Sequence, residues 1–395
     1  MTYNLSKESF NNLIMNILFV VYTSGGNGGH YRSLITLCNL LSPHHSVEIV
    51  NIGRFESPVI MQSQIRHSFA FFNKRNWNSV SKSLRLVITS HKIDVVHAFD
   101  YFSYDAAFFC ASKIGIPVVL TKCGGPAPQI PALYPPIENL IVFSKEDKIF
   151  FKKRKGYKTI THIPNRALPY ELNNDAIAEL RSILKLDNKF VVLRIGRISH
   201  AYYSTIKQAI RLTSVLRKYG LDAEVIILGS VDNEDVLKEL EDAKNRKPFI
   251  HIITEDRYTK DAKSIIGVAD AVVGTGRGFM EACFQNKIMY APVANSEFPA
   301  PVSDENIEDI LGYNFSERYI SKTRITEEQL YQNAISEPHS ESWFKKYFDI
   351  NSALPVYQRV YQSLYNSRYY FFTRVIVSRL LISLSSFKTV RLLVK

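Results

Sequence analysis

The 395-residue sequence contains only four cysteines, none of them in a Cys-x-x-Cys pair or at a zinc-type spacing from histidine. Small secreted domains held by disulfides use far more cysteine, and structural zinc sites need paired ligands at short spacing. We therefore expect a chain from a reducing compartment that holds no structural metal ion.

Long apolar runs are also absent, because no uninterrupted apolar stretch approaches the roughly 20 residues that cross a bilayer. The amino-terminal segment does not resemble a secretory signal peptide. Lys7 and Glu8 precede an apolar run, Ile17 to Tyr22, that is too short and leads directly into a glycine-rich loop. These absences predict a cytoplasmic protein without a transmembrane segment.

Acidic residues are too few to balance the basic ones: 37 Asp and Glu stand against 49 Lys and Arg, a net charge of +12. Residues 145–158 carry seven basic and two acidic residues, and residues 350–395 carry seven basic residues and no acidic one. These two stretches, at +5 and +7, account for the whole excess. Because the rest of the chain is neutral, we expect no nucleic acid partner.

What the sequence does contain is an alternation of apolar runs of strand length with stretches of helix length, repeated twice in the first 290 residues. Such alternation is typical of βα units around a parallel sheet. The predicted strands are Asn16–Tyr22, Val47–Asn51, Asp94–Ala98, Pro117–Thr121, Leu140–Phe143 and Ile160–Ile163, then Phe190–Ile195, Glu224–Leu228, Ile250–Thr254, Ala271–Val273 and Ile288–Ala291.

The predicted fold class is therefore α/β, with two Rossmann-like parallel-sheet domains that face a cleft. At about 150 residues per domain the length suits two cores, which we place at residues 16–165 and 166–345. Open α/β sheets bind ligands beyond the carboxyl ends of their strands, so we expect the functional site in the cleft between the domains.

The first predicted strand leads into a glycine-rich turn, Gly25-Gly26-Asn27-Gly28-Gly29, before a helical pattern begins at His30. Glycines allow the backbone to approach a ligand at which the N–H groups of a helix start can point. The spacing is not a dinucleotide fingerprint, because Tyr31 stands where the third glycine is needed, and no phosphate-loop Lys-Ser or Lys-Thr follows. Gly28 and Gly29 are candidate ligand-facing residues, with a plain flexible turn as the alternative.

In the second half, Arg197 follows a predicted strand, where a guanidinium can grip a diphosphate through two parallel hydrogen bonds. The stretch Gly274–Gly278 follows another strand, and its backbone N–H groups together with Arg277 suit a phosphate. Glu281 can accept hydrogen bonds from the vicinal hydroxyls of a ribose. Two simpler roles stay open: an ordinary surface arginine at position 197, and a carboxylate at position 281 that only complements the helix dipole.

The order of these pieces resembles the retaining GT-B glycosyltransferases of the family-4 type, over residues 16–366. The resemblance implies a GT-B fold and an enzyme of the hexosyltransferase type, which moves a sugar from a nucleoside-diphosphate sugar with retention and without a metal or other cofactor. The pieces that carry it are Gly28-Gly29-His30, Asp94–His97, Ile116–Thr121, Val142–Ser144, Ile163–Asn165, Gly196-Arg197, Ala269-Asp270 and Glu281-Ala282.

The resemblance also implies roles for single residues. The nucleotide sugar would lie on the second domain, with Arg197 at the diphosphate and Glu281 at the ribose, and Lys207 would stand in for a lysine that the family has shortly after Gly-Arg. The phosphate or sugar would meet Gly274, Gly276, Arg277 and Gly278. The acceptor would lie against the first domain and the cleft wall, near Gly28, Gly29, His97, Cys123 and Asn165.

This sequence departs from the family pattern at several positions. Val273 stands where a Glu, seven residues, Glu pattern would begin, no lysine occurs at 201–203, and Arg166 replaces a common glycine. Cys123 stands where a histidine is common, and a thiol cannot shuttle protons as imidazole does. The alternative function is therefore a non-catalytic GT-B protein that binds a sugar nucleotide or glycan as a scaffold in a biosynthetic complex.

Two other rivals are weaker. A nucleotide-sugar epimerase would bring several carboxylates and histidines to the cleft, and the sequence offers too few. A dehydrogenase that uses a nicotinamide cofactor is disfavoured by the failed glycine spacing.

The carboxyl-terminal part divides into residues 346–366, which by the same resemblance form a helix that returns to the first domain, and residues 367–395, a basic apolar tail. We interpret the tail as an interfacial helix on an anionic membrane, with packing on the second domain or on a partner subunit as the alternative. Together with residues 145–158, it predicts a peripheral location on the inner face of the cell membrane. For residues 145–158 the alternative is a solvated helix end whose lysines complement the helix dipole. The expected acceptor is a glycan or a lipid-linked acceptor in surface polysaccharide biosynthesis.

Overall fold

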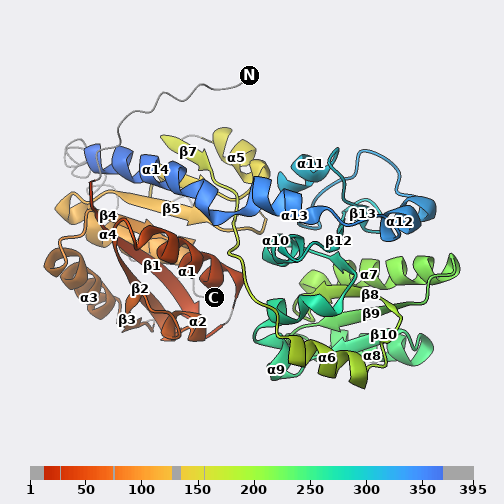
Figure 1. Ribbon diagram of the computed structural model, residues 1–395. Coiled ribbons are helices and arrows are strands. Elements are labelled where there is room, and N and C mark those ends of the chain that lie inside the picture. The colour runs from red at the N-terminus through yellow and green to blue at the C-terminus, as the bar shows by residue number, and fades with distance from the viewer. Residues whose placement is uncertain (1–12, 27, 74–75, 127–134, 155, 368–395) are drawn as a thin grey trace.

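The structure is a computed structural model, and it describes residues 13–26, 28–73, 76–126, 135–154 and 156–367. Two lobes lie side by side, with the amino-terminal half of the chain in one and most of the remainder in the other (Figure 1). The two lobes confirm the predicted fold class, because each is built around its own sheet of mainly parallel strands. Within the described residues, no helix is both long enough and apolar enough to cross a membrane.

The first lobe contains a seven-stranded sheet in which every neighbouring pair is parallel, in the order β3-β2-β1-β4-β5-β6-β7. Its central strands read as continuous apolar runs because helices cover both faces. The strands are β1 (Asn16–Ser24), β2 (Ser46–Phe55), β3 (Arg66–Phe71), β4 (Val95–Ala98), β5 (Val118–Lys122), β6 (Asn139–Val142) and β7 (Thr159–His162). The helices are α1 (Gly29–Leu41), α2 (Pro58–Met61), α3 (Trp77–Ser90), α4 (Tyr101–Ala111) with a following 3-10 turn (Ser112–Ile114), and α5 (Lys145–Lys152).

The second lobe contains a six-stranded sheet in the order β10-β9-β8-β11-β12-β13, in which only the short β13 is antiparallel to its neighbour. Its strands are β8 (Phe190–Ile195), β9 (Ala223–Leu228), β10 (Ile250–Ile253), β11 (Ala271–Val273), β12 (Ile288–Ala291) and β13 (Ala300–Pro301). The helices that surround it are α6 (Asn174–Ile183), α7 (His200–Lys218), α8 (Glu234–Arg246), α9 (Asp256–Thr259), a 3-10 helix (Ala262–Val268), α10 (Gly276–Phe284), α11 (Ile307–Leu311), α12 (Glu327–Ala334) and α13 (Ser340–Trp343).

Every strand predicted from the sequence overlaps an observed strand, so these predictions are confirmed. Two strands were not predicted, β3 and β13. β3 lies at the sheet edge with most of its side chains partly exposed, and β13 has only two residues, so neither shows the apolar run of a buried strand.

The chain passes between the lobes twice, and the two crossings are hydrogen-bonded to each other. The Ala167 N–H donates to the carbonyl of Phe348 at 3.0 Å, and Ala167 forms an isolated parallel bridge with Asp349. After this bridge the chain forms a short 3-10 turn (Ile350–Ala353) and then α14 (Leu354–Asn366), with Pro355 in its first turn. Figure 1 shows α14 in blue lying along the first lobe.

α14 packs on the first sheet through an apolar face that includes Tyr357, Tyr361 and Leu364. This face shares one core cluster with α1 and with the side chains on one face of the central strands, whereas α3, α4 and α5 cover the other face. α14 is therefore part of the core of the first lobe, although the second lobe precedes it in sequence.

His97 lies in this core and not on the cleft wall, so its predicted position was wrong. Its side chain is fully buried, with Nδ1 2.8 Å from the Tyr361 hydroxyl and Nε2 2.6 Å from the hydroxyl of Thr121. Successive side chains of a strand point to opposite faces, and His97 in β4 points to the face that α14 covers. Both ring nitrogens have partners there, so the imidazole has a structural role.

The buried imidazole predicts a pH-dependent stability. Burial lowers the pKa of His97 to about 3, whereas an unfolded chain titrates its histidines near 6.5. Between these values the unfolded chain binds more protons, so the free energy of unfolding falls as the pH drops below about 6.5, by up to roughly 1.4 kcal/mol per pH unit from this group. Urea unfolding at several pH values should show a smaller pH slope in His97→Gln.

The matched control is His44→Gln, which makes the same substitution at an exposed histidine and should leave the slope unchanged. An equal slope in the wild type and in His97→Gln would contradict the neutral buried imidazole.

Candidate functional site

The order of the strands locates the place where each sheet is expected to bind ligands. In the first sheet the chain runs outward from β1 to β2 and β3, then returns to β4 on the other side of β1. In the second sheet it runs outward from β8 to β9 and β10, then returns to β11 beside β8. Crevices form where the strand order reverses, outside the carboxyl ends of the strands. The loops after β1, β4, β8 and β11 are therefore the candidate site.

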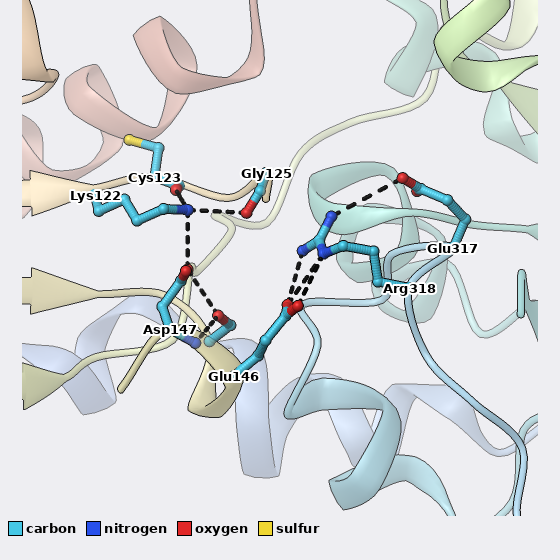
Figure 2. A network of polar contacts seen from close by, with 8 residues as sticks. Lys122, Cys123, Gly125, Glu146, Asp147, Glu317 and Arg318 are labelled. Carbon is cyan, nitrogen blue, oxygen red and sulfur yellow. Dashed lines mark hydrogen bonds and ion pairs between the residues drawn. The ribbon is translucent and has the colours of Figure 1, made fainter. Parts of the chain in front are cut away.

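The carboxyl edges of the two sheets face each other, because segments that follow β1 and β6 in the first lobe contact segments that follow β10 and β13 in the second. Arg32 of α1 donates from Nη2 to the carbonyl of Lys260 at 2.5 Å and lies 3.6 Å from Asp261. Glu146 in the first turn of α5 accepts from Nε and Nη2 of Arg318 at 3.1–3.2 Å, and Figure 2 shows this ion pair. We refer to the surfaces between these contacts as the interdomain face.

On the first lobe, the predicted pair Gly28 and Gly29 lies at the start of α1. Gly28 is the residue before the helix, no side chain caps the helix start, and a Cβ added to Gly29 would have no heavy atom within 4 Å. His30 follows, with its ring 3.8 Å from that of Tyr31. Burial and the nearby Arg197 guanidinium lower the pKa of His30 to about 4, so the imidazole is neutral near pH 7.

Arg197, on the second lobe, lies after β8 and opposite His30. Its side chain is 58% exposed, pairs with Asp232 at 2.9 Å, and lies 5.3 Å from the centre of the Tyr202 ring. The guanidinium therefore remains accessible, and its one close carboxylate partner among the described residues is itself partly exposed.

Gly274 and Thr275 connect β11 to α10, and Gly276–Gly278 form the first turn of α10, so the stretch follows a strand as predicted. A Cβ on Gly274 would lie 2.7 Å from the Phe279 Cα, so the loop passes directly over the helix start. Gly276 has φ +49°, a conformation that glycine adopts without strain, and a Cβ on Gly278 would have no neighbour within 4 Å.

Arg277 and Glu281, one helical turn apart in α10, form an ion pair. The Arg277 Nε donates to Oε1 of Glu281 at 2.7 Å, and both side chains are largely buried, at 13% and 10% exposure. Arg277 Nη1 also donates to the carbonyl of Arg166 on the crossing segment at 3.4 Å. The ion pair orients the Glu281 carboxylate through its Oε1 atom. In the described structure the Arg277 guanidinium therefore binds a protein carboxylate.

Asn314 lies close to glycines of both lobes, and no sequence pattern marks it. Its Nδ2 would lie 2.8 Å from a Cβ added to Gly124 of the first lobe and 3.7 Å from one added to Gly276 of the second. Its Oδ1 is buried and has no hydrogen-bond partner among the described residues. Asn314 adopts φ +54°, so its position depends on a turn that pattern reasoning does not detect.

A buried ion pair between Lys122 and Asp147 stabilises the loop that contains Cys123 and Gly124. Lys122 Nζ donates to Oδ2 of Asp147 at 3.0 Å and to the carbonyls of Cys123 and Gly125 at 3.2 and 2.8 Å (Figure 2). The Cys123 thiol lies 3.7 Å from the carbonyl of Phe99, and burial raises the pKa of this thiol well above its usual range. A neutral thiol is a poor nucleophile, so the burial of Cys123 favours a role in the shape of the loop.

Two more predicted residues, Asn165 and Lys207, make no hydrogen bond or ion pair with Arg197 or Glu281 within the described structure. Asn165 is largely buried on the crossing segment, where its Oδ1 accepts from the Arg166 N–H at 3.0 Å. Lys207 is exposed on α7, 4.6 Å from the centre of the Tyr203 ring, and Tyr203 interacts with Glu239 of α8. Across the described ranges, no group of three or more His, Cys, Asp or Glu side chains could hold a metal ion.

Sequence reasoning missed Arg194, which lies next to the end of β8. Its side chain is 1% exposed, and Nε and Nη2 donate to the Thr205 hydroxyl at 3.1 and 2.9 Å. The sequence does mark this residue, because Arg194 is the one charged residue of the apolar run Phe190–Ile195. Charged side chains are rarely fully buried without a partner of opposite charge.

Comparison with known protein families finds no match, and no curated protein matches the sequence. Solved structures do match. HepE from Anabaena in complex with UDP-glucose has 17% identity and a TM-score of 0.61, over 89% of this chain and 99% of HepE. A glycosyltransferase from Rickettsia africae has 13% identity and a TM-score of 0.62, over 89% and 98% of the two chains. UDP-GlcNAc 2-epimerase from Methanocaldococcus jannaschii has 14% identity and a TM-score of 0.52, over 82% and 92%.

These similarities show the fold: the chain has the two-domain GT-B architecture that the sequence predicted. At such low identities they do not assign a reaction, and the same architecture occurs in glycosyltransferases and in an epimerase.

The tight contact at Gly274 predicts how the candidate loop responds to substitution. Gly274→Ala should lower the free energy of unfolding by about 1–3 kcal/mol, because the new Cβ overlaps backbone atoms of Phe279 that cannot move independently. Gly278→Ala is the matched control, since it adds the same methyl group to open space inside α10. It should be neutral or stabilising by up to about 1 kcal/mol. Urea unfolding of both variants measures the difference, and equal effects would contradict the described loop.

Proposed function

We propose that this protein is a glycosyltransferase that takes a sugar from a nucleoside-diphosphate sugar bound on its second lobe. The observation that carries the proposal is the position of Arg197, the loop Gly274–Gly278 and the oriented carboxylate of Glu281. They follow β8 and β11, at the point of the second sheet where the strand order reverses. The GT-B architecture supports this function, because solved glycosyltransferases with it include HepE in complex with UDP-glucose.

The chemistry requires stabilisation of the negative charge that develops on the leaving diphosphate. Arg197 and the amino-terminal ends of α7 and α10 supply positive potential at this edge of the sheet. Glu281 would accept hydrogen bonds from the ribose hydroxyls, with Arg277 holding the carboxylate in place. We assign no general base, because retention by front-face attack needs none. Retention, hexosyl specificity, family-4 membership and independence from metal or other cofactor are parts of this proposal.

The acceptor would approach from the first lobe at the start of α1, where a Cβ on Gly29 would meet open space and Gly28 lies against the ring of His30. A glycan or lipid-linked acceptor in surface polysaccharide biosynthesis fits the basic character of residues 145–158 and 367–395. This part of the proposal rests on the sequence, and residues 368–395 lie outside the described residues.

Calorimetric titration with UDP, GDP and ADP, in buffer that contains EDTA, tests the donor site. One nucleotide should bind with micromolar affinity, and Arg197→Ala and Glu281→Ala should each weaken binding by about 1–3 kcal/mol, the range for hydrogen bonds to charged groups. Arg211→Ala is the matched control, since Arg211 lies further along α7 and pairs with Glu297.

Binding of no nucleotide would contradict the proposal. Binding without turnover of any nucleotide sugar would favour the alternative function, a non-catalytic GT-B protein that acts as a scaffold. Interconversion of the bound nucleotide sugar without an acceptor would indicate an epimerase.

The membrane part of the proposal predicts a tail-dependent interaction. The full chain should sediment with vesicles that contain anionic lipid, and a chain that ends at Ser367 should do so much less, because it lacks six basic residues and most of the apolar tail. Vesicles of uncharged lipid provide the control for the electrostatic component. Equal sedimentation of the two chains would contradict the role of the tail.

A further inference from the structure

Arg194 is a buried cation without a nearby anion. None of the described carboxylates lies within 4.0 Å of its guanidinium, whose partners are neutral: the hydroxyl of Thr205 and the carbonyl of Ile195. Glu317 is the carboxylate that acts on it from further away, and Glu317 itself faces Arg318 at 3.9 Å (Figure 2). Burial lowers the pKa of Arg194 to about 10, which still leaves it charged near pH 7.

The guanidinium lies directly beneath the loop that carries Arg197. A Cβ added to Gly196 would lie 3.1–3.3 Å from Nη2, Cζ and Nη1 of Arg194. The same loop leads into α7, a 19-residue helix with no acidic side chain in its first turn. The side chain of its N-cap residue, Ser199, makes no capping hydrogen bond, and the His200 N–H donates to the neutral Oδ1 of Asn233 at 3.3 Å. The positive end of the helix and the buried guanidinium therefore add to each other on the interdomain face.

Such an arrangement costs free energy in the protein alone. A buried charge is unfavourable unless an opposite charge compensates it, and replacing it with an apolar side chain of similar size is often neutral or stabilising. An anion bound above Gly196 would compensate both Arg194 and the helix start. Only the backbone of the Gly196 loop would separate this anion from the Arg194 guanidinium. The attraction between the two charges would be stronger there than in water, because protein has a lower dielectric constant.

We propose that Arg194 is a positioning residue of the donor site: it supplies a second positive charge for the diphosphate from beneath Gly196, without touching it. Arg197 contacts the diphosphate from the solvent-exposed side of the loop. Arg194 packs against the buried side of Gly196 and adds positive electrostatic potential at the loop. The inference rests on the proposed function for the identity of the ligand, but the anion site itself depends only on the geometry around Gly196.

The test compares ligand affinity with the stability of the free protein. Arg194→Met should leave the melting temperature of the ligand-free protein unchanged or higher, and should weaken UDP binding by about tenfold or more. Uridine, which has no phosphate, should bind equally to both proteins. Arg194→Lys should restore part of the UDP affinity because it keeps the charge. Inorganic pyrophosphate is titrated in parallel as a probe of the anion site alone.

A purely structural role gives the opposite result, a lower melting temperature and unchanged UDP affinity, and would overturn the inference. Pyrophosphate binding that depends on Arg194, without binding of any nucleotide, would retain the anion site and reject the proposed donor. Binding of neither would reject both. If Arg194→Met does not fold, Thr205→Val removes the hydroxyl that holds the guanidinium and should weaken UDP binding by several fold, with uridine again unaffected.

Discussion

The docking of α14 on the first sheet is the constraint on which the rest of the structure depends. The chain leaves the first lobe at residues 163–170, builds the second lobe, and returns beside its own exit through the Ala167–Asp349 bridge. The Tyr361 hydroxyl then meets the buried imidazole of His97. Because both crossings are fixed by hydrogen bonds and by a shared core, the carboxyl edges of the two sheets are held facing each other.

The interdomain face divides its charges into those with partners and those without. Glu146 pairs with Arg318 across the lobes, Arg277 pairs with Glu281 within α10, and Arg197 has a partly exposed partner in Asp232. Arg194 has no comparable partner among the described residues. The paired charges hold the two lobes and the site in place. The uncompensated positive potential lies at the carboxyl end of β8 and at the amino-terminal start of α7. A dianionic ligand is the chemistry that this distribution favours.

Much of this fold could be predicted from the sequence because parallel strands buried on both faces leave continuous apolar runs. β3 was missed because it lies at the sheet edge, where Ala70 is its only buried side chain, so its sequence lacks the apolar run of a buried strand. The placement of His97 was wrong for another reason: the pattern identifies a strand but not which face a later helix covers. Arg194 was visible as a charge inside an apolar run, whereas Asn314 is brought to the site by a loop remote in sequence from Gly124.

The departures of this sequence from the family pattern also bear on mechanism. At position 123 the buried thiol stays neutral, and Lys122 and Asp147 instead fix the backbone of the loop. His97 is enclosed by Tyr361 and Thr121, and the pKa of His30 is held low by burial and by Arg197. None of these groups is placed as a strong general base. Under the proposed function, sugar transfer would therefore depend on stabilisation of the departing diphosphate, a contribution that the arginines and helix starts of the second lobe would make.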